Sequence, residues 1–473
     1  MRIIYSCIAL CLTAFNALAV TIESASGQLA SNISDKSITT LQVNGTINAV
    51  DFKFIADELT SLESLDISNT TITAYTGSKP LFANACSFSD NAIPVGCFAN
   101  SKLQSIALPA SLTVIGEGAF LSCNSLTDIT LPESVDSIAP YAFSACENLA
   151  AMIIPASVKV IGTGSFSHCT ALTSVKVTDG SVDLKIADNA FYGCTALASA
   201  DLANRTLSIG NAAFCSCKGE NFAIVLGNNS RLNSIGENAF QNSTLKAFDL
   251  TKCPKVTTIP QYAFADTKLQ SISIPENIKF IGEGAFFGNE ALTNIDLANN
   301  SASIAKLLFA GCNLTETTGM TDQTTEVGDY AYYGCDQIGK LIIPENVAYI
   351  GNYAFGNMSN LAKVTSINTS APSLGEAVFS GINTTDVLLT TKIASTGYRN
   401  GDQWKEFTFT TNGDANDNGI ININDITTII SHIKGKTPYS FLLEAADVNV
   451  DNTVDQTDVD EVLDIIIKSA PIE

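Results

Sequence analysis

Ile115-Gly116-Glu117-Gly118-Ala119-Phe120 decides the fold, because close variants of this stretch recur along the chain. It returns as Ile138-Ala139-Pro140-Tyr141-Ala142-Phe143 and as Ile161-Gly162-Thr163-Gly164-Ser165-Phe166. We call its aromatic position the anchor. Thirteen anchors follow one another at intervals of 22 to 26 residues: Phe98, Phe120, Phe143, Phe166, Phe191, Phe214, Phe240, Phe264, Phe286, Phe309, Tyr332, Phe355 and Phe379. A repeat of this length is typical of a solenoid.

The apolar residues within one repeat predict how each coil is built. Leu126, Ile129 and Leu131 alternate as in a short strand, which Pro132 ends, and Ala142-Phe143 predict a tight, helical turn. One coil cannot bury this apolar set alone, but stacked coils merge into one core and pair their strands in parallel. We therefore predict a repeat solenoid with a parallel β-sheet on one face and short turns or helices elsewhere.

Seven cysteines stand three residues after an anchor, which predicts a column of thiols in the stack. We expect them to be small, reduced core residues, because a column does not converge on one point as metal ligands or disulfide partners do. The seven are Cys123, Cys146, Cys169, Cys194, Cys217, Cys312 and Cys335. Cys86 and Cys97 lie outside the column and are the candidate disulfide pair.

The unit Leu172-Thr173-Ser174-Val175 through Ala190-Phe191-Tyr192-Gly193-Cys194 resembles the BspA-like leucine-rich repeat of bacterial surface proteins. The resemblance covers roughly residues 30 to 410. It divides this part into an N-terminal flank with a first repeat (20–92), the repeats (93–382) and a C-terminal cap (383–410) that contains Trp404. The family implies extracellular or cell-surface interaction, including adhesion, and not catalysis.

The first residues predict export. Arg2, a mostly apolar stretch and Ala17-Leu18-Ala19 have the order of a signal peptide over residues 1–19. A later apolar run long enough to span a membrane is absent from the sequence, so we expect a secreted or cell-surface protein without a membrane span. With 25 basic and 47 acidic residues the net charge is −22, which argues against nucleic acid as a partner.

The last segment, residues 411–473, contains two twelve-residue calcium loops. Oxygen-bearing side chains stand at the ligand positions, and position 7 offers a backbone carbonyl. The predicted ligands are Asp414, Asn416, Asn418, Ile420, Asn422 and Asp425 in the first loop, and Asp447, Asn449, Asp451, Thr453, Asp455 and Asp458 in the second. Such hard ligands select Ca²⁺, so we expect two calcium sites in a small all-α domain. The predicted helices are 426–434 and 459–467.

Aspartate at position 12 and a loop-helix unit without a full preceding helix resemble a type I dockerin over residues 413–468. That resemblance implies calcium binding and docking onto a cohesin-like partner. Positions 10 and 11, often important in this contact, are Ile423-Asn424 and Gln456-Thr457. They differ from each other and from the usual Ser/Thr pair, which departs from the standard cohesin contact.

Six residues at the outward strand position are the candidate ligand-binding set: Thr130, Lys176, Asp201, Asp249, Ser273 and Asp296. Simple solvation ranks first for them, a recognition surface second, and catalysis by paired carboxylates last. The motifs of the common hydrolases and phosphate-binding enzymes are absent from the sequence, so we predict that the protein is not an enzyme.

Two functional hypotheses follow. In the first, an exported interaction protein binds an extracellular protein or glycan with its solenoid face, and its calcium-dependent C-terminal module docks or stabilises the chain. In the alternative, the protein is an accessory or inhibitory component of a dockerin-cohesin assembly that degrades polysaccharides.

Overall fold

The computed structural model describes residues 20–469 except 79, 84, 298–302, 392–396, 399–402, 412, 417–419, 439–440, 442 and 450–452. The predicted signal peptide therefore lies outside the described residues, as do Asn418 and Asp451 of the calcium loops. The chain divides into two compact units, residues 1–267 and 268–473, which we describe separately. Among the helices of the described part, none is long and apolar enough to cross a membrane.

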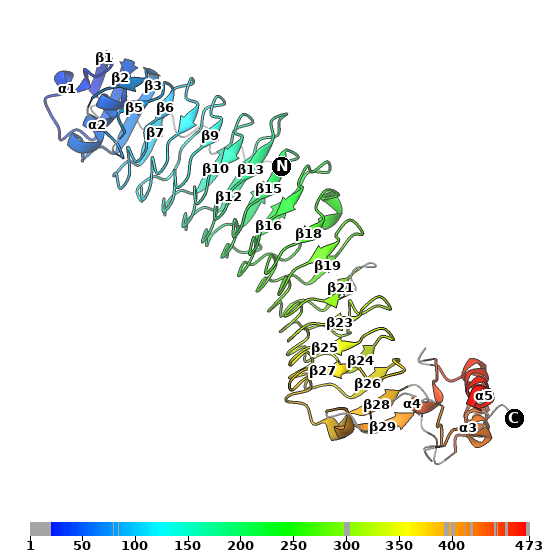
Figure 1. Ribbon diagram of the computed structural model, residues 1–473. Helices are drawn as coiled ribbons and strands as arrows, with labels where there is room; N and C mark the ends of the chain where they lie inside the picture. Colours follow the sequence, from blue (N-terminus) through cyan, green and yellow to red (C-terminus); the bar gives the residue numbers. More distant parts are fainter. Residues whose placement is uncertain are drawn as a thin grey trace. The chain divides into compact units, whose positions relative to one another are not determined.

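The first unit opens with a flank of three parallel strands and two helices (Figure 1). Its elements are β1 (Val20–Ser24), α1 (Leu29–Asn32), β2 (Thr40–Ile47), α2 (Ala49–Glu58) and β3 (Ser64–Ile72). Asn48 and Asp51 form a capping box at the start of α2. The buried Asp51 carboxylate also accepts from the backbone amides of Gly27 and Leu29, which ties the preceding loop to the helix.

Coils follow this flank, and most contribute two short strands. The first set is β7 (Ser105–Ala107), β10 (Ala151–Ile154), β12 (Ser174–Val177), β14 (Ser199–Asp201) and β16 (Ala223–Val225). The second set is β6 (Ala92–Ile93), β8 (Val114–Ile115), β9 (Ser137–Ile138), β11 (Val160–Ile161), β13 (Leu184–Ile186), β15 (Thr206–Ile209), β17 (Ser234–Ile235) and β18 (Thr258–Ile259). The described strands of the stack pair in parallel, and β4 (Tyr75–Thr76) and β5 (Ser87–Phe88) form an antiparallel pair.

The predicted helical turn is wrong: the turn around each anchor is not helical. Tyr141 and Ala145, two residues before and after Phe143, both have φ of 56°, in the left-handed region. Such left-handed positions interrupt a right-handed helix, and the bonds within the turn reach back only three residues, as from Ala142 to Ala139 and from Ser144 to Tyr141. The backbone amides of 141, 143 and 145 instead donate to the carbonyls of Thr163, Ser165 and Ser167 in the next coil.

We call this arrangement the turn ladder. Within each unit, three amides of a coil donate to three carbonyls of the next coil. The amides that make these ladder bonds therefore point toward the C-terminal side of the coil, and the carbonyls that accept them point toward the N-terminal side. The ladder holds the anchors in register, so that Phe120, Phe143, Phe166 and Phe191 stack with ring centroids 5.1–5.2 Å apart. This stack forms the centre of the buried core.

The second unit continues the same design. Its first-set strands are β19 (Ser271–Ser273), β21 (Asn294–Asp296), β24 (Lys340–Ile343), β26 (Lys363–Ser366), β28 (Leu388–Thr391) and β29 (Thr408–Thr411). Its second-set strands are β20 (Phe280–Ile281), β22 (Ser303–Ile304), β23 (Glu326–Val327), β25 (Tyr349–Ile350) and β27 (Ser373–Leu374). The short 3₁₀ helices are η1 (Leu250–Lys252) in the first unit and η2 (Thr384–Asp386) and η3 (Trp404–Glu406) in the second.

Trp404 covers the last anchor. Its indole packs edge-on against Phe379, with centroids 5.4 Å apart, and its Nε1 donates to the Pro372 carbonyl at 3.0 Å. After it come α3 (Ile423–Ile433), α4 (Leu443–Ala446) and α5 (Gln456–Ser469). Both predicted helices of the calcium module are present, and each begins three residues earlier than predicted.

Candidate functional site

Two of the predicted ligand residues lie side by side on the outward face of the β10-β12-β14-β16 sheet. Parallel register aligns Ile153, Lys176, Asp201 and Val225 in one row, while the neighbouring residues of each strand point into the core. Ile153 is 58% exposed and Val225 is 47% exposed, although both are aliphatic. The row therefore places a cation and an anion between two exposed apolar side chains.

A hollow of about 450 Å³ lies along this row. Ile153, Lys176 and Asp201 line it together with Asp179 and Asn204 from the turns that follow the strands. Asn204 Nδ2 donates to the Asp179 carboxylate at 3.1 Å, and this bond holds the pKa of Asp179 below its ordinary value. We call this site the sheet-face hollow.

Arg205, next to the hollow, was not singled out by the sequence analysis. Its side chain is fully buried, and its guanidinium donates to the carbonyls of Pro155, Val158, Thr178 and Val182, in two preceding coils. Burial lowers the pKa of Arg205, yet arginine stays protonated in proteins, so the carbonyls solvate a cation. A single arginine in a polar turn gives no sequence signal for such a role.

The other predicted ligand residues are scattered. Thr130 is exposed and lines a separate hollow of about 740 Å³ on the first coils, in a segment that is not regular strand. Asp249 does not lie in a strand: its carboxylate accepts from the Thr251 amide and caps η1. In the second unit, exposed Ser273 and Asp296 stand opposite one another on β19 and β21.

The two calcium loops are closed by the same pair of hydrogen bonds. In the first loop, the amides at positions 3 and 9, Asn416 and Asn422, donate to the Asp425 carboxylate at 3.2 and 2.9 Å. In the second, the amides of Asn449 and Asp455 donate to Asp458 at 3.3 and 2.9 Å. This equivalence matches the internal repeat predicted from the sequence.

The residues of the first loop fit a divalent cation. Asn416 Oδ1, a predicted ligand atom, is buried without a hydrogen-bond partner among the described residues. Burial, together with the nearby Asp414, raises the pKa of the Asp425 carboxyl, although its backbone hydrogen bonds act the other way. A cation would satisfy the amide oxygen and offset the burial of the two acids. Within the described residues, groups of three or more His, Cys, Asp or Glu that could hold a metal are absent.

Both helices of the module pack on a shared core and leave apolar side chains outside it. Ile426, Ile429, Val459 and Val462 are buried in that core. Exposed on the same helices are Ile423, Ile433, Leu463 and Ile467.

The predicted disulfide between Cys86 and Cys97 is not formed in this structure. Both are free thiols, with Cys97 buried and Cys86 half-buried. The described residues of the cysteine column are also free thiols.

Comparison with known families separates the chain into two parts. A family model described as the BspA type leucine rich repeat region matches residues 91–221, 208–338 and 325–436. A second model, the dockerin type I domain, matches residues 412–466. Proteins of these two kinds are generally extracellular or cell-surface interaction proteins, and dockerin type I domains generally bind calcium. A search of curated proteins found no match.

One solved structure supports the fold. A leucine-rich repeat protein from Bacteroides ovatus is 20% identical over 84% of this chain and 92% of its own, with a TM-score of 0.54. A leucine rich cell surface protein from Faecalibacterium prausnitzii is 24% identical over 73% of this chain and 82% of its own, with a TM-score of 0.39. The first likeness establishes the solenoid fold alone.

Proposed function

Because the chain belongs to the BspA-type leucine-rich-repeat family and carries a dockerin type I domain, we propose that it is an exported, non-enzymatic interaction protein. Its repeats bind an extracellular partner through the sheet-face hollow, in an adhesive role. Its calcium module docks onto a cohesin-type partner and carries two calcium ions.

The observation that carries the first part is the row Ile153, Lys176, Asp201 and Val225. Exposed aliphatic side chains beside charges of both signs match the mixed surface of a protein more closely than the hydroxyl-rich surface of a glycan. A protein partner is therefore the better fit for this hollow.

The alternative is an accessory or inhibitory role in a polysaccharide-degrading assembly. It is favoured by the dockerin match and by the exposed Ile423, Leu463 and Ile467, which offer a cohesin an apolar contact. The two roles are compatible, because one part of the chain would dock while the other presents the hollow.

A pull-down of the full chain from an envelope extract tests both roles. The unchanged chain is used as bait with calcium and with chelator. A variant with both Lys176→Glu and Asp201→Lys is used with calcium. Its control is Lys185→Glu, which changes an exposed lysine on β13 outside the hollow. We expect one partner to depend on calcium and another to be lost only in the hollow variant. Partners retained by every bait would contradict the proposal.

A further inference from the structure

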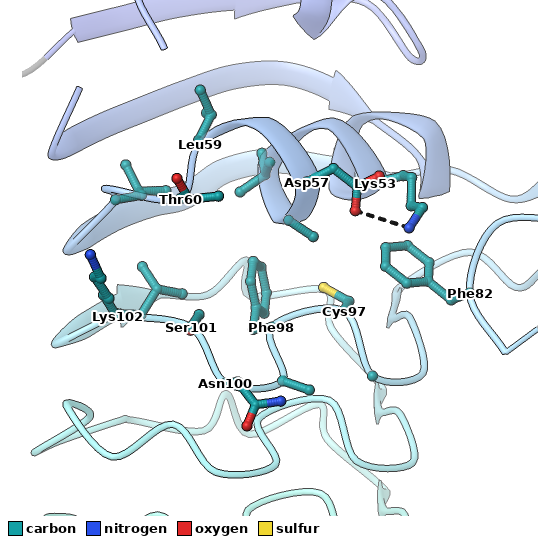
Figure 2. A pocket seen from close by; sticks show the side chains of 16 residues that line it. Lys53, Asp57, Leu59, Thr60, Phe82, Cys97, Phe98, Asn100, Ser101 and Lys102 are labelled. Carbon is teal, nitrogen blue, oxygen red and sulfur yellow. Dashed lines mark hydrogen bonds and ion pairs between the residues drawn. The ribbon is translucent and has the colours of Figure 1, made fainter. Parts of the chain in front are cut away.

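A groove of about 410 Å³ lies between α2 and the first turn of the ladder (Figure 2). The helix forms one wall and residues 96–103 form the other. Its floor is apolar and buried, with Ile55 and Leu59 from the helix and Phe98 and Leu103 from the turn. The groove belongs to neither the sheet-face hollow nor the calcium module.

The turn wall of the groove carries a row of backbone carbonyls. In later coils, three carbonyls accept the ladder amides of the preceding coil. They belong to the residues three before, one before and one after the anchor. In the first turn these carbonyls belong to Val95, Cys97 and Ala99, and α2 takes the place of a preceding coil. Of these three residues, Cys97 and Ala99 line the groove. None of the three accepts a hydrogen bond from a described residue. A helix side offers no free amides, so the row is left for a donor-bearing ligand.

The charges at the rim restrict that ligand. Lys53 Nζ is 2.9 Å from the Asp57 carboxylate, so this pair is neutral overall, and exposed Lys102 lies at the other end (Figure 2). The remaining lysine disfavours a cation, while the carbonyl row disfavours an anion. A neutral ligand with several hydrogen-bond donors meets both conditions.

An extended peptide does not meet them. The edge of a β-strand presents amides and carbonyls in alternation. Every second group of a bound peptide would therefore be a carbonyl facing the carbonyls of the groove, where it could form no hydrogen bond. A sugar has hydroxyls that can all donate, so it meets a row of acceptors without placing a carbonyl against it. Thr60 and Ser101 at the rim add hydroxyls that donate or accept.

We propose that this groove binds one end of a neutral glycan. The site is independent of the protein partner assigned to the sheet-face hollow, and gives the chain a second recognition surface of different chemistry. The sugar hydroxyls would donate to the carbonyls of Cys97 and Ala99.

Calorimetric titration of the full chain with neutral oligosaccharides built from glucose, mannose and galactose tests the site. Ala56 faces the groove from α2 and is half-buried, so Ala56→Trp fills the groove without touching the carbonyl row. We expect at least one oligosaccharide to bind and its affinity to fall at least tenfold in Ala56→Trp. Thr60→Trp, at the exposed rim, serves as a second blocking variant that does not depend on packing within the helix.

The matched control is Ala171→Trp, a half-exposed alanine in another coil outside the groove. It should bind the oligosaccharide as the unchanged chain does, and so should the Lys176→Glu and Asp201→Lys variant. Absence of binding across the panel, or equal binding by both blocking variants and the control, would overturn the proposal. Loss of binding in the Lys176 and Asp201 variant would place the glycan in the sheet-face hollow instead.

Discussion

The thiol of Cys146 donates a hydrogen bond to the carbonyl of Phe120 in the preceding coil, with Sγ and O 3.0 Å apart. The same bond joins Cys169 to Phe143 at 3.1 Å and Cys335 to Phe309 at 3.1 Å. Each of these anchor carbonyls also accepts the amide three residues later in its own coil, so the thiol adds a second donor, from the next coil. The column of cysteines thus links each coil to the one before it.

These thiols should resist chemical modification. Burial raises the pKa of Cys169 and of Cys312 to about 12, so both stay protonated at pH 8, where a free thiol begins to ionise. We expect a disulfide exchange reagent to label half-buried Cys86 in the native protein and the column only after denaturation. Rapid native labelling of Cys169, located by peptide mass analysis, would contradict this.

The same shifts predict that stability falls at high pH. The folded state keeps the proton of Cys169 up to about pH 12, while the thiol of the unfolded chain loses it near its ordinary pKa of 9.0. The stabilisation is thus complete below pH 9.0 and is lost as pH rises toward 12. Urea unfolding between pH 8 and 11 should show a steeper decline for the unchanged chain than for Cys169→Ala.

Substitution of Arg205 should lower the free energy of unfolding more than most single substitutions do. Arg205→Ala leaves several buried carbonyls without a donor, and we expect the free energy of unfolding to fall by about 4 kcal/mol. Arg231, in an exposed ion pair with Asp183, is the control, and Arg231→Ala should cost less than about 1 kcal/mol. Equal effects in urea denaturation would argue against the role of the buried guanidinium.

The left-handed positions of the turns predict that replacing alanine by glycine has opposite effects on stability at Ala145 and Ala142. Ala145 has φ of 56°, and Ala145→Gly removes a strain of about 1–2 kcal/mol at an entropic cost of about 0.5–1 kcal/mol. Ala142 is buried, and φ is not positive there. We therefore expect Ala145→Gly to raise the melting temperature and Ala142→Gly to lower it.

Calcium binding should follow the two closing aspartates. Asp425→Ala and Asp458→Ala each remove the closing ligand of one predicted calcium site. Titration of either variant should therefore give one calcium per chain in place of two. Asp460→Ala, an exposed aspartate on α5 outside the loops, should keep both sites. Unchanged stoichiometry in both loop variants would place calcium elsewhere.

The fold was predictable because the anchors recur at one spacing, and a repeat of identical residues leaves little choice of architecture. The turn conformation was not predictable from one coil, because its left-handed positions hold Gly or Asn in some coils and Tyr, Ala, Ser or Leu in others. Asp249 was predicted in a strand, which was wrong. Its carboxylate accepts from the nearby Thr251 amide, and this local bond replaces strand pairing.

The candidate sites show the same division. Lys176 and Asp201 were both predicted at the outward strand position, and the parallel pairing of β12 with β14 places them side by side. The buried contacts of Arg205 and the groove below α2 depend on how separate coils and the flank meet in space. Both therefore required the structure.

The single direction of the turn ladder also bears on how such a chain can change length over evolution. Each coil offers donors on one side and acceptors on the other, so any coil can follow any other head to tail. Duplicating or deleting one whole coil restores every bond at the new junction, whereas losing part of a coil breaks three at once. Genes for such arrays can therefore gain or lose reach in whole units, while the flank and the calcium module remain unchanged at the two ends.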